Sequence, residues 1–289
     1  MAQILKAAPV VEALNERLER RIVSLKETGV TPTLAIIRVG EKPADLSYER
    51  GARKRCEAAG VRVKLFALPE DCSQEELERT ITGVNRSIDL HGCLMLRPLP
   101  RTLDEAAACA LLDPEKDVDC LTPSSLYGVF ANEATGFPPC TAEAVIATLD
   151  HYGIGLAGKR VTVVGRSLVI GKPVSMMLQA RNATVTMCHT HTADMREECR
   201  RAEILVVAAG HAHTITPEFV SGGQVVVDVG INFDEETHKL CGDVDFATVE
   251  PLVEAITPVP GGLGTVTSAI LCKHVVDAAE RQTGRRTSR

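Results

Sequence analysis

One segment of this 289-residue chain constrains its fold more than any other: an apolar run that leads through a glycine-containing loop into a helix. Residues 160–164 read Arg-Val-Thr-Val-Val, which is typical of a buried parallel strand because β-branched side chains suit a sheet covered on both faces. Gly165 permits a tight turn, Gly171 permits close approach to the backbone, and Pro173 suits the first turn of a helix. Free N–H groups at a helix start attract anions, so the segment predicts a phosphate-binding loop.

The chain after this loop repeats the alternation of strand and helix. Apolar strands are expected near Ala183–Met187, Ile204–Ala208 and Val225–Val229. This order predicts a doubly wound parallel sheet, whose ligands bind at the carboxyl ends of the strands. Ser167 stands where the usual dinucleotide-binding pattern has its second glycine, and an ordinary turn between strand and helix is the alternative. We interpret the loop as nucleotide-binding.

The charge near the second strand of this sheet indicates which dinucleotide binds. An NAD site usually has Asp or Glu at the end of that strand, but here Cys-His-Thr follows at 188–190 and the first carboxylate is Asp194. Arg166, helped by the Thr190 hydroxyl, would instead bind the 2′-phosphate of NADP. NADP is therefore the expected cofactor and NAD the less favoured one, while the alternative for Arg166 is an ordinary surface arginine.

Composition and charge limit the classes of protein that remain. Hydrophobic residues make up 45% of the chain, enough for two ordinary cores, and a net charge of −6 argues against nucleic acid as the main partner. With no apolar run of about 18 residues and no amino-terminal secretion pattern, we expect neither a membrane span nor export. The ten cysteines form no C-x-x-C pairs, which is typical of reduced thiols in the cytoplasm.

Two histidine pairs, His189 with His191 and His211 with His213, each follow an expected strand. They could converge on one edge of the sheet and bind a metal ion. No cysteine or carboxylate cluster at ligand spacing supports such a site. We therefore expect no metal and place these histidines in loops near the cofactor.

The first half of the chain predicts another α/β unit. Helices are expected at Val10–Lys26, Asp45–Ala59 and Gln74–Arg86, and strands at Thr33–Val39, Val61–Leu68 and Gly92–Leu96. A boundary is expected near 138–141, because a helix over Ala142–Tyr152 follows directly. The basic tail 281–289 has no periodic apolar residues and is expected to be solvated or disordered.

Eight motifs in order resemble those of the methylenetetrahydrofolate dehydrogenase/cyclohydrolase family. They are Tyr48 in its helix, Pro98–Pro100, Pro114–Asp119, Pro139–Thr141, Gly165–Ser167 with Gly171–Pro173, Asp228–Asn232, Gly242–Val244 and Pro258–Gly264. The resemblance spans nearly the whole chain. It implies oxidation of 5,10-methylenetetrahydrofolate with NADP and, in most members, hydrolysis of the methenyl product to 10-formyltetrahydrofolate.

The resemblance also implies an organisation. It implies two α/β domains, the second a Rossmann-like doubly wound parallel sheet, with a folate cleft between them. The expected folate-binding catalytic domain is 1–141 plus 266–289, and the expected NADP-binding domain is 142–265. It further implies a cytoplasmic homodimer that acts on tetrahydrofolate one-carbon derivatives, in one-carbon metabolism and purine biosynthesis.

Site residues follow from the motifs. Tyr48 and Asp119 are the expected catalytic pair: Asp119 would bind the pterin ring, and Tyr48 would stack on it or donate a hydrogen bond. The alternatives are a loop carboxylate that caps a turn and a half-buried helix aromatic. The substrate-binding set is Tyr48, Leu96, Arg97, Pro98, Asp119, Pro260, Gly261, Gly262, Gly264 and Thr267. The cofactor-binding set is Thr141, Gly165, Arg166, Ser167, Gly171, Pro173, His189, Thr190, Gly210, Gly230 and Ile231.

Two departures from the family pattern bear on the chemistry. The family has lysine four residues after the tyrosine, on the same helical face, where this chain has Ala52. Lys54 lies roughly 200° and Arg53 about 100° further around the helix, so neither replaces it simply. The family glutamine that holds this lysine is replaced by Leu96, and Arg97 follows as the first candidate for a substitute.

These departures affect the two half-reactions unequally. Hydride transfer needs mainly orientation and exclusion of water. Hydrolysis needs a positioned acid or base, which typically contributes about 10²–10⁴-fold. We therefore expect a dehydrogenase whose cyclohydrolase activity is weak or lost. The alternatives are a full bifunctional enzyme with a substitute group and a catalytically silent folate- or nucleotide-binding homologue.

Overall fold

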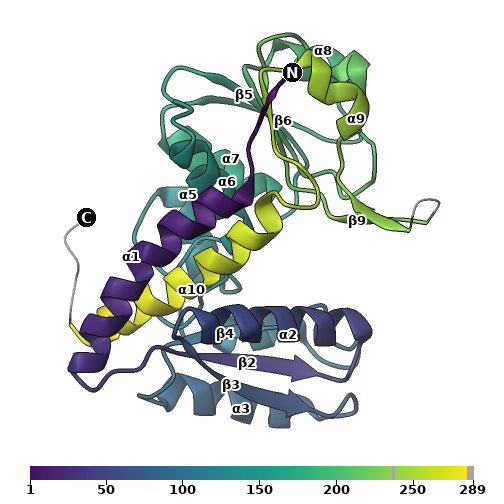
Figure 1. Cartoon of the computed structure of the whole chain (residues 1–289). Helices are drawn as coiled ribbons and strands as arrows, with labels where there is room; N and C mark the ends of the chain where they lie inside the picture. Colours follow the sequence, from purple (N-terminus) through teal and green to yellow (C-terminus); the bar gives the residue numbers. More distant parts are fainter. Residues whose placement is uncertain (236–237, 285–289) are drawn as a thin grey trace. The chain divides into compact units, whose positions relative to one another are not determined.

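The chain forms two compact α/β units in a computed structural model, which describes residues 1–235 and 238–284 (Figure 1). One unit comprises Met1–Glu12 and Thr141–Thr267, and the other comprises Ala13–Cys140 with the chain from Ser268 onward. Each is built around its own parallel sheet. No helix among the described residues is long and apolar enough to cross a membrane. The two-domain α/β class expected from the sequence is confirmed.

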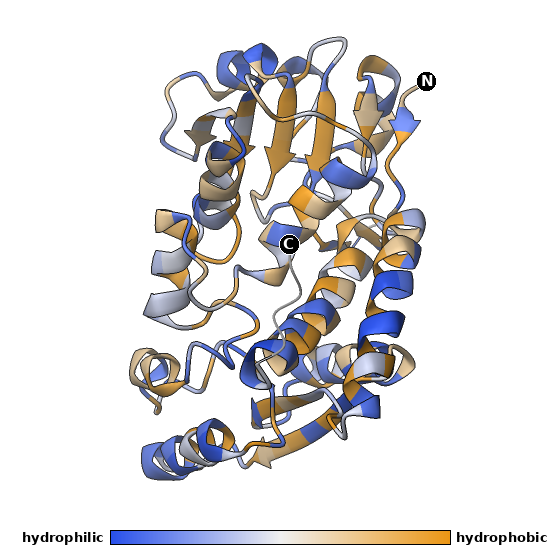
Figure 2. Ribbon diagram, turned by 90° about the vertical axis from the view of Figure 1, so that its left-hand side faces the viewer, coloured by the Kyte–Doolittle hydropathy of each residue, from blue (hydrophilic) through white to orange (hydrophobic). Residues whose placement is uncertain are grey.

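The first unit contains a six-stranded parallel sheet in the order β1-β11-β8-β7-β5-β6. Its strands are β1 (Gln3–Ile4), β5 (Arg160–Val164), β6 (Thr184–Cys188), β7 (Ile204–Val207), β8 (Val225–Asp228) and β11 (Ala255–Ile256). Its helices are α6 (Cys140–His151), α7 (Gly171–Ala180), α8 (Met195–Arg201) and α9 (Phe246–Val249), with 3-10 turns at Pro217–Phe219 and Glu250–Leu252. Strands β5, β7 and β8 are almost entirely buried, as parallel strands covered on both faces require, and Figure 2 shows fully hydrophobic strands inside a sheet. The strand order reverses at β5, where ligands of such sheets bind.

Some elements of this unit carry no sequence signal that predicts them. Strands β1 and β11 have two residues each, too few for a period, yet they pair in parallel and Leu5 N donates to Ile256 O at 2.8 Å. This pairing places Met1–Glu12 in the unit that contains β5, whereas the sequence placed these residues in the folate domain. The short hairpin of β9 (Asn232–Asp234) and β10 (Lys239–Cys241) was also not predicted.

The second unit contains a three-stranded parallel sheet in the order β3-β2-β4. The strands are β2 (Thr33–Val39), β3 (Arg62–Leu68) and β4 (Gly92–Met95), and the helices are α2 (Pro43–Ala58), α3 (Gln74–Arg86), α4 (Glu105–Leu111) and α5 (Pro123–Ala131). Helices α2 and α3 cover opposite faces of the sheet, so the central strand β2 is buried along its whole length (Figure 1). Helix α4, like α5, was not predicted, because each is short and lies among proline-bounded loops.

Two long helices cross from one unit to the other along the sequence, α1 (Ala7–Glu27) and α10 (Leu263–Gln282). The basic tail, expected to be solvated or disordered, begins inside α10, where Arg281 is helical and exposed to solvent. Its guanidinium donates to Gly136 O at 2.9 Å and lies 4.1 Å from the centre of the Phe137 ring. An aromatic face and a carbonyl thus hold this arginine in the fold. Residues 285–289 of the predicted tail lie outside the described residues.

A buried carboxylate fixes the loop between α4 and α5. Asp117 is fully buried and accepts hydrogen bonds from Leu121 N and Thr122 N, both at 2.7 Å, and from Ser125 Oγ at 2.6 Å. Three donors compensate the charge for its lost hydration. The loop conformation, and with it the position of Asp119, therefore depends on this side chain.

We expect Asp117→Asn to lower the free energy of unfolding by about 1–3 kcal/mol, because the amide turns a donor toward groups that are themselves donors. Urea unfolding followed by circular dichroism measures the change. Asp71→Asn at an exposed position is the matched control and should leave the midpoint unchanged. Equal midpoints for the two variants would contradict the role of Asp117.

Candidate functional site

The two expected catalytic residues of the folate site act on each other electrostatically. Tyr48 lies on α2 and is 44% exposed, and Asp119 lies within the loop that Asp117 fixes. Burial raises the pKa of Tyr48, and the charge of Asp119 raises it further. Burial also raises the pKa of Asp119, against the hydrogen bond that its Oδ1 accepts from Cys140 N at 2.9 Å. The site thus combines a phenol that stays protonated with a carboxylate that accepts hydrogen bonds.

A buried polar cluster supports Asp119 from behind. His274 on α10 is completely buried, and its Nδ1 lies 2.9 Å from Val118 O and 3.6 Å from the Cys140 Sγ. The Cys140 thiol donates to the same carbonyl at 3.2 Å. Sequence reasoning missed this support: Cys140 lay inside a quoted motif, but nothing in the sequence marked His274.

The two positions at which the motif resemblance implies lysine and glutamine are both apolar and buried. Ala52 is 3% exposed, one turn after Tyr48 on α2. Leu96 is 6% exposed at the end of β4, where its N–H donates to Ile37 O at 2.9 Å. Neither side chain can carry or accept a proton, so these two positions contribute only apolar surface.

Two of the three cations weighed as substitutes for the lysine, Arg97 and Arg53, are engaged with carboxylates. Arg97 Nη1 lies 3.4 Å from Glu105 Oε1 on α4. Arg53 Nη2 lies 3.0 Å from Glu49 Oε1, and the other oxygen of Glu49 binds the buried Arg38 at 2.7 Å. These ion pairs hold both arginines in protein contacts.

The glycine-rich loop of the predicted substrate set lies in the other unit. Gly261 has a φ of +97°, a left-handed conformation that favours glycine. A Cβ on Gly262 would clash with the carbonyl of Pro258, and one on Gly264 would lie 3.3 Å from Ile231 Cδ1. The structure therefore brings this loop beside Ile231 of the predicted cofactor set. Thr267, the fifth residue of α10, donates its hydroxyl to Leu263 O at 3.2 Å.

The phosphate loop has the strand-turn-helix form that its sequence predicts. Gly165 has a φ of +129°, and a Cβ there would clash with the Ala208 carbonyl. A Cβ on Gly171 would clash with the Gly165 carbonyl, so this glycine allows the backbone of the loop at Gly165 to lie close to the start of α7. The Ser167 Oγ accepts from Ile170 N at 3.1 Å, and Arg166 is exposed. The start of α7 and an exposed guanidinium thus lie together at the switch point of the sheet, an arrangement that fits a dinucleotide phosphate.

Of the other predicted cofactor residues, Pro173 and Thr141 lie in the first turns of α7 and α6.

Two carboxylates organise the next loops at this sheet edge. Asp228, at the end of β8, accepts backbone hydrogen bonds from Gly230 at 2.9 Å, Asp243 at 3.1 Å and Val244 at 2.9 Å. Burial raises the pKa of Asp228 to about 6, against those hydrogen bonds. Asp243 accepts from Gly210 N at 2.8 Å. The predicted cofactor residues Gly210 and Gly230 are thus held by carboxylates whose roles sequence reasoning did not assign.

The histidine pairs lie in loops. His189 and Thr190 follow β6, and His191 N donates to the His189 Nδ1 at 3.1 Å. The Thr190 side chain is exposed. Within the described parts of the chain, no group of three or more His, Cys, Asp or Glu side chains is placed to hold a metal ion.

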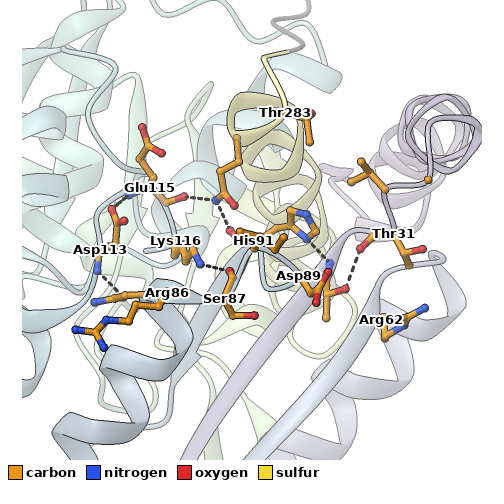
Figure 3. A pocket seen from close by; sticks show the side chains of 16 residues that line it. Thr31, Arg62, Arg86, Ser87, Asp89, His91, Asp113, Glu115, Lys116 and Thr283 are labelled. Atoms are coloured by element: carbon orange, nitrogen blue, oxygen red, sulfur yellow. Dashed lines mark hydrogen bonds between the residues drawn. The ribbon is translucent and has the colours of Figure 1, made fainter.

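A pocket of about 640 Å³ lies in the second unit, at the amino ends of the strands of the three-stranded sheet (Figure 3). It is lined by residues at the amino ends of the strands, among them Thr33, Arg62 and His91. Its buried Lys116 donates to the carbonyls of Val84 at 2.8 Å and Ser87 at 2.5 Å. None of the predicted site residues lines it, and ligands of parallel sheets bind at the carboxyl ends of strands.

Comparison with known proteins agrees with this geometry. The catalytic domain of tetrahydrofolate dehydrogenase/cyclohydrolase matches residues 5–119, and the NAD(P)-binding domain of the same family matches 139–283. The bifunctional protein FolD of Carboxydothermus hydrogenoformans is 50% identical over 281 residues, which cover 97% of this chain and 98% of that protein.

Solved structures of related enzymes give the same result. The bifunctional enzyme FolD of Campylobacter jejuni has a TM-score of 0.94 at 34% identity, covering 97% of this chain and 99% of that one. The methylenetetrahydrofolate dehydrogenase-cyclohydrolase of Trypanosoma brucei, complexed with NADP and an inhibitor, has a TM-score of 0.91 at 33% identity, with 98% of both chains covered.

Fold and site together define a two-domain α/β enzyme with an NAD(P)-binding domain. The chain belongs to the tetrahydrofolate dehydrogenase/cyclohydrolase family. The resemblance inferred from the motifs is thereby confirmed.

We expect Tyr48 to ionise above the ordinary tyrosine value of 10.0, because burial and then the charge of Asp119 disfavour the phenolate. Ultraviolet titration of the wild type minus Tyr48→Phe isolates this group. Asp119→Asn removes one of the causes and should move the Tyr48 step to lower pH. A Tyr48 step at or below the ordinary value in the wild type would contradict the geometry described here.

Proposed function

We propose that this protein is an NADP-dependent methylenetetrahydrofolate dehydrogenase whose methenyltetrahydrofolate cyclohydrolase activity is weak or lost. The observation that carries the proposal is the joint burial of Ala52 and Leu96 at the positions where the family has its lysine and glutamine. Both members of one polar pair are replaced by apolar groups, which avoids a lone buried cation or amide. The chain thus lacks a titratable group at this place on α2.

The remaining groups suit hydride transfer. The Asp119 carboxylate would accept hydrogen bonds from the N–H donors of the pterin, and the protonated Tyr48 would stack on the ring or donate to it. When bound, NADP supplies the nicotinamide that accepts the hydride. Orientation of the reduced folate is what these two side chains contribute, and orientation is the main requirement of this step. Arg97, Pro98 and the 260–267 loop would complete the folate contacts.

The cofactor proposal rests on the loop after β5. Arg166 and Thr190 would bind the 2′-phosphate, and the N–H groups at the start of α7 would bind the pyrophosphate. Gly210 and Gly230 would lie along the dinucleotide. The Trypanosoma brucei relative was solved with NADP, which supports the choice over NAD.

The family resemblance supports several further assignments, and the cysteine pattern adds support for the cytoplasm. These are a homodimer, the cytoplasm, a role in purine biosynthesis and the expected assignment of folate and NADP binding to separate domains. We propose them on that ground.

A second candidate is the full bifunctional activity. The relative that is 50% identical carries the name bifunctional protein FolD, and that name favours hydrolysis in this chain as well. In that case another group must act as the acid or base.

We expect purified protein to reduce NADP when mixed with methylenetetrahydrofolate but to hydrolyse methenyltetrahydrofolate only weakly, because no positioned base is available. Absorbance of NADPH and of the methenyl compound measures the two steps. Ala52→Lys with Leu96→Gln should raise the hydrolysis rate by about 10²-fold or more while NADP reduction continues. Brisk wild-type hydrolysis would establish the bifunctional candidate, and nucleotide binding without hydride transfer would leave a silent homologue.

We expect Arg166→Ala to raise the KM for NADP by roughly ten- to a hundredfold, because a charge-assisted hydrogen bond to phosphate is lost. The KM for NAD should stay the same, since NAD has no 2′-phosphate. Arg181→Ala, which breaks a surface ion pair to Asp150, is the matched control. Equal effects of Arg166→Ala on both cofactors would refute the assignment.

A further inference from the structure

One cation of α2 has a setting that its neighbours lack. Arg55 lies seven residues after Tyr48, which is about two helical turns, so both side chains share a face of α2. It lies three residues after Ala52, on the adjacent turn. Side chains on a helix lean toward its amino terminus, so Arg55 can reach back over the turn that contains Ala52.

The position of the guanidinium agrees with this direction. A Cβ built on Gly51 would lie 3.4 Å from Arg55 Nη2, so the guanidinium extends back by about one turn. Gly51 has no side chain to occupy that space. The end of Arg55 therefore lies along the turn that follows Tyr48.

Arg55 is also free to bind a ligand. Among the residues that the structure describes, no carboxylate lies within ion-pair distance of Arg55, whereas Arg53 and Arg97 each have one. Its side chain is exposed. Burial and the Asp119 charge raise the pKa of Tyr48, and the Arg55 charge opposes them, so the guanidinium lies within electrostatic range of the phenol.

We propose that Arg55 supplies, from the next turn of α2, the positive charge that Ala52 does not provide, and that it binds hydrogen-bond acceptors of the reduced folate beside Tyr48. This inference rests on the proposed function. A guanidinium has a pKa above about 12 and stays charged throughout catalysis. Arg55 therefore holds and orients substrate without moving a proton, which supports hydride transfer and leaves hydrolysis without an acid or base.

The test compares Arg55→Ala, Arg55→Lys and Lys54→Ala. Lys54 is a matched control because it is an exposed cation on the same helix, about 100° away. We expect Arg55→Ala to raise the KM for methylenetetrahydrofolate roughly ten- to a hundredfold with the KM for NADP unchanged. Arg55→Lys should retain part of the affinity, and Lys54→Ala should match the wild type. Thermal unfolding checks that every variant is folded.

Calorimetry with tetrahydrofolate gives a second readout that needs no turnover. Arg55→Ala should weaken this binding by the same factor as the change in KM. Ala52→Lys and Leu96→Gln combined with Arg55→Ala should regain the affinity and gain hydrolysis, because the cation has moved to a residue that titrates and that the glutamine holds. If Arg55→Ala binds and turns over like Lys54→Ala, this inference fails while the proposed function stands. If the wild type neither binds folate nor reduces NADP, both fail.

Discussion

Buried carboxylates that accept backbone N–H groups are the constraint on which both parts of the site depend. Asp117 accepts two such hydrogen bonds from the loop between α4 and α5, and Asp228 accepts three from the loops that follow β8 and β10. Buried N–H groups of irregular backbone that find no carbonyl partner need another acceptor, and a buried carboxylate supplies it here. Without these two groups, the loops that carry Asp119 and Gly230 would have no fixed conformation, and the predicted ligand contacts would have no fixed geometry.

Different carboxylates fix the loop conformation and face the expected ligand. Asp117 is two residues from Asp119, yet it is enclosed by its own loop, whereas Asp119 accepts hydrogen bonds from Cys140 and acts electrostatically on Tyr48. Asp119 thus keeps oxygen lone pairs for a ligand. The same division holds for Asp228 and Asp243 on one hand and the glycines they hold on the other.

The sequence predicts those elements that have a regular hydrophobic period and those loops that carry a motif. Strand β2 and helix α3 agree with the prediction at both ends, because their hydrophobic spacing is long and regular and Ser73 caps α3. The two-residue strands β1 and β11 have no period, and their pairing depends on residues about 250 positions apart. The contact of His274 with Cys140 likewise forms only when the chain folds and α10 brings the two side chains together, so no local sequence pattern predicts it.

Ala52, where the motif resemblance implies lysine, illustrates what a motif leaves open. A motif compares the residue at a single position with the family residue at that position. On a helix, however, charged side chains one turn apart lie on the same face and can reach the same ligand group. Arg53 and Arg55 are close in sequence, yet Arg53 binds Glu49 and Arg55 extends back toward the turn of Gly51. A positive charge on this face and proton transfer are therefore separable. Any long cationic side chain that reaches the ligand can supply the charge, whereas proton transfer requires a group whose pKa permits it to release a proton.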